Sequence, residues 1–245
     1  MISRLALLIC MALAALPGCS RLNPQSPQLV TAMQGDPFAK VTAQDLSTTL
    51  PQRRLLIAAI AGDKAEIRKI KKSGADLDAL DPSAGMTPLH IAVNGNELNA
   101  VKLLIEAGAS PNTQMAGGGP TPLYDAVCAN NVAMTELLLK HGANANVRDR
   151  NLGSGLLHLT ALEGPVKLTE LLIAAGADVN LRDNRGVTAL HLAANSDRPE
   201  VIEMLARAGA DVNAKTDKGT TPLQVAKRHP DRKTTIELLE KLGAK

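Results

Sequence analysis

One pattern recurs through most of this 245-residue chain with a period of 33 or 34 residues. Its clearest copy is Thr87-Pro88-Leu89-His90, and the first position of the pattern returns at spacings of 34, 34, 33 and 33 residues. A Gly-Ala pair keeps step with it, and its glycines are Gly74, Gly108, Gly142, Gly176, Gly209 and Gly243. Two markers in phase over six copies predict that one small unit is built repeatedly and stabilised by stacking on its neighbours.

The composition agrees with a stack of small units. Aromatic residues make up 1% of the chain and tryptophan is absent, so its core must be built from Leu, Ile, Val and Ala. The net charge of +3 is too small to indicate a nucleic acid partner. The scarcity of aromatic rings also removes the stacking platforms of single-strand binders. No nucleic acid is therefore expected among the partners.

Each copy of the pattern predicts a short first helix. Thr87 is suited to cap it, since its hydroxyl can accept a hydrogen bond from a backbone N–H, and Pro88 suits the first helical position. Leu89 should face inward. The small residues at one inner position would let a neighbouring helix approach closely, and they are Ala92, Ala126, Ala193 and Ala226.

A second helix follows a polar break in each copy. After Asn94-Gly95-Asn96 it is predicted over Val101 to Ala107, and Gly108 should end it in the left-handed conformation that glycine adopts cheaply. Residues 110–120 then read as an extended finger leading to the next repeat. Asp and Asn residues recur in register in these fingers, which turn chemistry explains.

These motifs resemble the ankyrin repeat family over roughly residues 52 to 245. The resemblance implies an all-α solenoid of about six helix-turn-helix repeats with hairpin-like fingers, in a domain spanning 41–245. The repeats are expected near 52–84, 85–118, 119–152, 153–185, 186–218 and 219–245, with the first and last as caps. The family implies a monomeric module that binds another protein on a concave face of fingers and inner helices, with no cofactor.

The N-terminus resembles a bacterial lipoprotein signal. Arg4 precedes an apolar run from Leu5 to Leu16, which suits a signal peptide and is too short to span a membrane. The run ends in Leu16-Pro17-Gly18-Cys19, similar to the lipobox whose cysteine is lipidated after cleavage. Residues 1–18 are then the signal peptide, Cys19 the lipidated residue and 19–40 a flexible tether. Ordinary signal cleavage, with Cys19 incidental, is the alternative.

The location follows from the anchor. Ser20 rather than Asp follows Cys19, which favours an outer-membrane lipoprotein facing the periplasm over the inner membrane. Without lipid the protein would be soluble in the periplasm. Cys128 is then the one thiol left, and it is expected to be a small packing residue on an inner helix, with a reactive thiol as the alternative.

Neither metal nor enzyme chemistry is expected. His90, His158 and His191 lie one repeat apart, about 8–10 Å by helix packing distances, whereas zinc ligands all lie about 2 Å from one ion. A hydrogen-bonding role near each helix start explains these histidines better. The chain contains no nucleophile elbow, phosphate loop or His-Glu-x-x-His motif.

The candidate partner-binding residues are those where a copy departs from the pattern. Tyr124 stands where other copies have histidine, and its ring could anchor a partner or pack within the fold. Met115 lies in a glycine-rich finger. Leu162 lies in the fourth copy, which lacks the Thr-Pro pair. The later fingers are basic, whereas the early ones carry Asp76, Asp78 and Asp81, so an acidic partner could be oriented, although charged fingers also serve solubility. The basic candidates are Arg148, Arg150, Arg182, Arg185 and Lys215, with Lys218 beside them.

Three functions remain open at this point. The leading hypothesis is an immunity-type inhibitor, anchored in the envelope, of a periplasmic toxin such as a lipase effector. The second is an envelope scaffold that supports another periplasmic protein, for example an antioxidant enzyme. The third is a hydrolase with an unrecognised site. The first two are suggested by analogy and location rather than by a residue signature.

Overall fold

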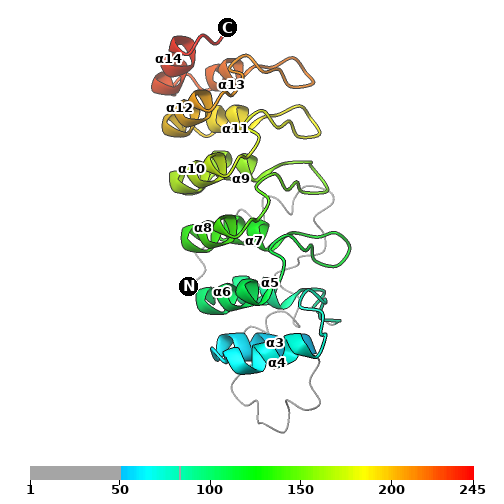
Figure 1. Cartoon of the computed structure of the whole chain (residues 1–245). Helices are drawn as coiled ribbons and strands as arrows, with labels where there is room; N and C mark the ends of the chain where they lie inside the picture. The colour runs from blue at the N-terminus through cyan, green and yellow to red at the C-terminus, as the bar shows by residue number, and fades with distance from the viewer. Residues whose placement is uncertain (1–50, 83) are drawn as a thin grey trace. The chain divides into compact units, whose positions relative to one another are not determined.

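The computed structural model describes residues 51–82 and 84–245, and this part of the chain is all-helical. Its twelve helices form six pairs that stack in sequence order, with the hairpin-like fingers projecting to one side (Figure 1). The predicted fold class is confirmed. The helices are α3 (Pro51–Ile60), α4 (Lys64–Lys72), α5 (Pro88–Asn94), α6 (Leu98–Ala107), α7 (Pro122–Cys128), α8 (Val132–Lys140), α9 (Leu156–Leu162), α10 (Val166–Ala174), α11 (Ala189–Asn195), α12 (Pro199–Arg207), α13 (Pro222–Lys227) and α14 (Lys233–Lys241).

The predicted signal peptide, Cys19, the tether and the segment 41–50 lie outside the described residues. Within the described ranges, no helix is long and apolar enough to span a bilayer.

The first helix begins with the predicted threonine cap in the second, third and sixth repeats. The Thr87 hydroxyl accepts a hydrogen bond from the His90 backbone N–H at 3.3 Å, and Pro88 occupies the first helical turn. Thr121 and Thr221 cap α7 and α13 at the same distance. The fourth copy has glycine at this position and therefore no hydroxyl cap. A threonine hydroxyl thus caps three of the six first helices, α5, α7 and α13.

The second helix of the second repeat is longer than predicted. It begins at Leu98 rather than Val101, because Asn96 adopts a left-handed φ of 58° and lets the Glu97 N–H reach the Ala92 carbonyl at 2.9 Å. Asn96 thereby completes the turn between helices within a few residues. Gly108 ends the helix with a φ of 111°, as predicted.

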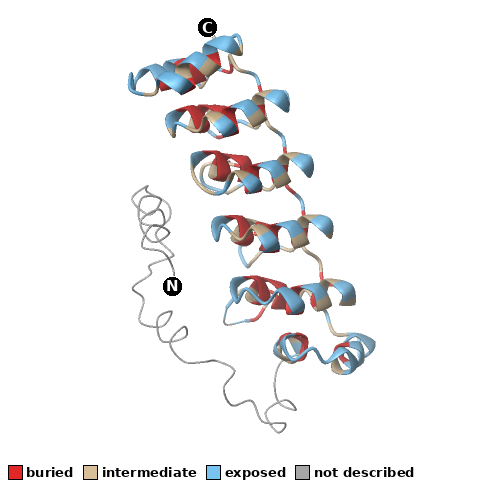
Figure 2. Cartoon of the chain, turned by 90° about the vertical axis from the view of Figure 1, so that its left-hand side faces the viewer, coloured by how far each residue is buried: buried red, intermediate tan, exposed pale blue. Residues whose placement is uncertain are grey.

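The core lies between the two helix layers and between successive repeats (Figure 2). The leucine at one recurring position of each second helix from α6 onward is completely buried, and each contributes about 1.5–3 kcal/mol by leaving water; they are Leu104, Leu138, Leu172, Leu205 and Leu239. The predicted small inner residues are at most 1% exposed, namely Ala92, Ala126, Ala193 and Ala226. Close approach of first helices therefore uses alanine in these four repeats, as predicted, and the fourth repeat has the buried Thr160 in its place.

The fingers are joined to one another by an amide ladder. The Asn112 side chain donates to the Gly142 carbonyl at 3.0 Å and accepts from the Asn144 N–H at 2.7 Å. Asn146 and Asn180 repeat both contacts with the repeats that follow them, and Asn213 makes them with Gly243 and Lys245 after α14. The interpretation of these residues as turn and finger structure is confirmed.

Two side-chain placements differ from expectation. Cys128 ends α7 with its side chain exposed, so its assignment as a packing residue is wrong. Asp81 is 3% exposed and pairs with Arg53 at 2.8 Å, because the first repeat uses it to hold the finger against α3. An acidic early finger tip therefore loses one of its three charges to the interior.

Candidate protein-binding surface

The first helices and the fingers bound one continuous face of the stack, which we call the inner face. Equivalent positions on this face recur with the period of the repeats. One row of half-buried residues consists of Ile91, Asp125, Leu159, Leu192 and Val225. One helical turn later a second row is exposed, and it consists of Asn94, Cys128, Leu162, Asn195 and Arg228. Any partner lying along the inner face must contact these two rows.

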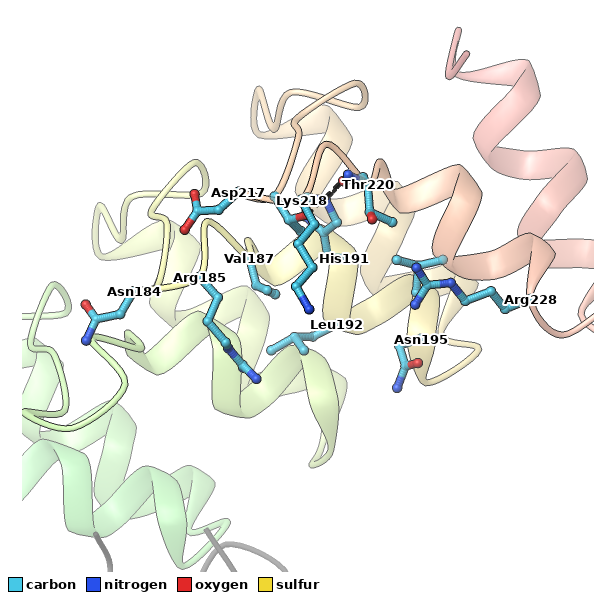
Figure 3. Close-up of a pocket in the computed structure, with 12 residues that line it drawn as sticks. Asn184, Arg185, Val187, His191, Leu192, Asn195, Asp217, Lys218, Thr220 and Arg228 are labelled. Atoms are coloured by element: carbon cyan, nitrogen blue, oxygen red, sulfur yellow. Dashed lines mark hydrogen bonds between the residues drawn. The ribbon is translucent and has the colours of Figure 1, made fainter. Parts of the chain in front are cut away.

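The inner face is hollowed between the last two fingers and helices α11 and α13. This hollow has a volume of ≈ 540 Å³, and both rows contribute to its wall through Leu192, Asn195, Val225 and Arg228. Arg185 and Lys218 extend from the two fingers toward Leu192 (Figure 3). The hollow is thus an apolar floor with basic side chains at its rim.

The charges around this hollow are only partly neutralised. Arg185 pairs with the buried Asp183 at 3.1 Å, and Arg182 pairs with Asp217 at 3.1 Å. Within residues 51–82 and 84–245, Lys218 and Arg228 form no ion pair. Their two uncompensated positive charges favour an acidic segment of a partner.

The centre of the inner face has the opposite sign. Asp125 of α7 is half-buried in the otherwise aliphatic first row, and its Oδ2 is buried with no hydrogen-bond partner among the described residues. Burial raises the pKa of the Asp125 carboxyl to about 7, and a hydrogen bond from Asn94 limits the rise. This carboxyl is poorly satisfied by its own fold.

The three histidines have a structural role. His90 Nε2 lies 3.1 Å from the Pro120 carbonyl, and His158 and His191 make the same contact with Val187 and Thr220. Burial lowers the pKa of all three imidazoles, which favours their neutral form. Each ring ties a helix start to the following finger, so the hydrogen-bonding interpretation is confirmed. No group of three or more potential metal ligands occurs in the described ranges.

Several basic candidates bind neighbouring fingers. The Arg148 guanidinium donates to the Arg182 carbonyl at 2.8 Å, and Arg182 donates in turn to the Lys215 carbonyl at 2.7 Å. The Lys215 side chain itself is exposed. A Cβ on Gly118 would lie 2.9 Å from Arg150 Nη1, so this glycine admits a close approach of Arg150. Arg148 and Arg182 therefore help to stack the fingers, which the sequence pattern did not indicate.

The apolar candidates fall in different environments. Tyr124 and Met115 are half-buried, and Tyr124 packs against the core. Leu162 is 37% exposed in the second row. Of the candidates, Leu162 and Arg185 lie on the inner face, whereas Asp125 and Arg228 were missed. The repeat register could have revealed both, because it places them in line with Leu192 and Asn195.

The comparisons with known proteins agree with this architecture. A model of ankyrin repeats in three copies matches residues 55–149 and 157–245. The mouse (Mus musculus) 2-5A-dependent ribonuclease is 32% identical over 88 residues, which span 36% of this chain and 11% of that protein. The chain thus spans about a tenth of the length of that curated relative.

Two solved structures are similar over most of the chain. One is an ankyrin repeat domain from Acinetobacter baumannii, with a TM-score of 0.68, 33% identity, and coverage of 78% of this chain and 98% of the other. Another is a chain in the complex of a predatory endopeptidase from Bdellovibrio bacteriovorus with an immunity protein, with a TM-score of 0.62, 33% identity, and coverage of 77% and 97%. The repeat geometry and the match over most of its length show that this chain belongs to the ankyrin repeat family.

Proposed function

We propose that this protein is an immunity-type inhibitor, which binds a toxic hydrolase of the cell envelope through its inner face. The observation that carries the proposal is its similarity to a chain of the endopeptidase–immunity protein complex, at 33% identity over nearly the whole of that chain. Ankyrin repeats bind other proteins, and we take the similar chain to be the immunity protein. A lipase effector and an endopeptidase both remain suitable toxins.

The charge distribution of the inner face supports inhibition by occlusion. Lys218 and Arg228 would hold an acidic segment of the toxin, and Leu192 and Val225 would give it an apolar seat. A rigid surface loses little conformational entropy on binding, because hydrogen-bonded fingers fix its shape beforehand. Such a surface can cover an active site without any chemistry of its own.

We further propose that Cys19 carries lipid and that the protein acts as a monomer facing the periplasm from the outer membrane. The segment Leu16-Pro17-Gly18-Cys19 and the apolar run before it support this location. Stable anchoring needs more than one acyl chain. Cys19→Ser should move the protein from the membrane to the soluble fraction, and retention of the variant in washed membranes would contradict the anchor.

The inhibitor role is tested by capture and assay. The tagged full chain is recovered from detergent-solubilised envelopes, bound proteins are identified by mass, and the hydrolase activity of each is measured with and without the chain. One stoichiometric hydrolase that loses activity when bound would support the proposal. A housekeeping enzyme whose activity is unchanged, or no stable partner, would overturn it and favour an envelope scaffold.

A further inference from the structure

The third repeat interrupts an aliphatic row at the centre of the inner face. Equivalent positions in the second, fourth, fifth and sixth repeats are Ile91, Leu159, Leu192 and Val225, and all are half-buried as Asp125 is. Leu192 and Val225 line the hollow between the last repeats, which shows that side chains of this row reach the binding face. The Asp125 carboxylate therefore makes fewer apolar contacts than the aliphatic side chains at the equivalent positions.

The fold does not compensate this carboxylate fully. Asp125 Oδ2 is buried and lacks a hydrogen-bond partner within the described residues, and the Asn94 side chain is the one hydrogen-bond donor that stabilises the charged form. A buried acceptor left unpaired lowers stability, whereas an aliphatic residue here would not. A residue that departs in this way from the pattern of its repeat, at a cost in stability, is expected at a binding site.

We propose that a lysine or arginine side chain of the partner protein enters the inner face at the third repeat and donates hydrogen bonds to Asp125. This inference rests on the proposed function, since it specifies the chemistry of the partner at that same face. The methylene stem of the basic side chain lies along Ile91 and Leu159, and its charged end meets the carboxylate.

The surroundings of Asp125 fit such a side chain. Leu162, 37% exposed in the second row, offers further apolar contact beside the entry point. The exposed Cys128 lies one helical turn after Asp125, so the face is open there. A partner without a cation would leave Oδ2 of the carboxyl unpaired and be disfavoured.

The two charged regions of the inner face also give it a direction. The negative centre at Asp125 lies in the third repeat, whereas Lys218 and Arg228 of the positive hollow belong to the fifth and sixth repeats. A partner with a basic side chain at one point and an acidic segment further along binds in one orientation, because the reverse places like charges together.

The first test measures the charge that a ligand meets at this place. In the full chain with Cys10→Ser and Cys19→Ser, Cys128 is the one remaining thiol. Its rates of reaction with trimethylammonium-ethyl and sulfonato-ethyl methanethiosulfonate are compared at pH 8 in neutral detergent. The ratio of cationic to anionic rate should fall about fivefold in Asp125→Asn. The matched control is Glu136→Gln, an equal charge change on the exposed side of α8, and it should leave the ratio unchanged. An unchanged ratio in Asp125→Asn would overturn the proposal.

The second test uses the partner captured by the unchanged chain. Asp125→Arg should weaken that complex about 30-fold or more, and Glu136→Gln should not. Equal binding by Asp125→Arg would overturn this inference and leave the inhibitor role standing. Capture of no partner by the unchanged chain would overturn both.

Discussion

The imidazole of His90 joins the start of its own helix to the next finger. Its Nδ1 accepts a hydrogen bond from the Thr87 backbone N–H at 3.4 Å, and its Nε2 donates to the Pro120 carbonyl at 3.1 Å. These two bonds require the neutral ring, because a protonated Nδ1 cannot accept. The same arrangement recurs in two further repeats at His158 and His191.

We predict that the folded state loses stability as the pH falls below 6.5. Burial lowers the pKa of His90, His158 and His191, so below their ordinary value of 6.5 the unfolded chain binds protons that the folded chain does not. Their contribution is complete above pH 6.5 and is lost on acidification, by at most about 1.4 kcal/mol per pH unit for each histidine. Urea unfolding followed by circular dichroism from pH 7.5 to 5.5 measures the slope.

The last repeat supplies the control for this prediction. Gln224 stands where the histidines stand, and its Oε1 accepts from the Thr221 N–H at 3.1 Å. A variant with glutamine at all three histidine positions should keep the capping bond and lose most of the pH slope. Both proteins are compared with Asp125→Asn included, because that carboxyl titrates in the opposite sense. A slope that survives in the glutamine variant would contradict the role of the rings.

Asp125→Asn is expected to stabilise the isolated protein at high pH. The folded-state pKa of about 7 exceeds the ordinary value of 3.8, so the folded chain holds a proton that the unfolded chain releases between these values. Stability is therefore complete below pH 3.8 and is lost as the pH rises through about 7. After allowance for partial exposure, the gain from asparagine at pH 8 should be about 2 kcal/mol. Equal urea midpoints of the two proteins at pH 8 would show that the carboxyl is well solvated.

Substitutions of two leucines should distinguish residues that stabilise the stack from residues that bind a partner. Leu138 is completely buried and Leu162 is 37% exposed, so the same truncation removes a core contact in one case and a surface contact in the other. Leu138→Ala should cost about 2–5 kcal/mol of unfolding free energy. Leu162→Ala should change stability by about 0.5 kcal/mol or less and weaken partner capture. A large stability loss in Leu162→Ala would place that side chain in the core instead.

The fold was predictable because its signals are local. Thr87, Pro88 and Gly108 each act within one turn of their own helix, and they lie where the sequence predicts the helix ends. The start of α6 was missed by three residues, since Asn96 forms a left-handed turn that asparagine permits without requiring.

The binding surface was less predictable because it depends on contacts between repeats. Arg148 and Arg182 look like free charges in the sequence, yet carbonyl groups one repeat away accept their hydrogen bonds. Tyr124 stands out by composition but packs against the core. Nothing in the sequence around Asp125 marks it as unusual. It stands out only in the folded stack, where the equivalent residues of neighbouring repeats are aliphatic.

The last prediction concerns the basic residues of the hollow, whose reversal should affect partner binding but not stability. Lys218 and Arg228 are exposed, lie on the rim of the hollow and have no ion pair within residues 51–82 and 84–245, so their reversal removes no contact that holds the repeats together. Lys218→Glu with Arg228→Glu should therefore leave the melting temperature within a few degrees of that of the unchanged protein. Capture of the partner should weaken at least about tenfold, and its dependence on salt should decrease, because the attraction is electrostatic.

The control for this variant makes the same charge change on the outer side of the stack. Lys140 and Lys72 are exposed at the ends of the second helices α8 and α4, and neither forms an ion pair within residues 51–82 and 84–245. Lys140→Glu with Lys72→Glu therefore changes the net charge equally without breaking an ion pair. If both double variants weaken capture alike, overall charge rather than the hollow attracts the partner. If neither does, the partner binds elsewhere on the stack. If circular dichroism shows the same helix content in all three proteins, loss confined to the hollow variant identifies Lys218 and Arg228 as the residues that hold the acidic segment.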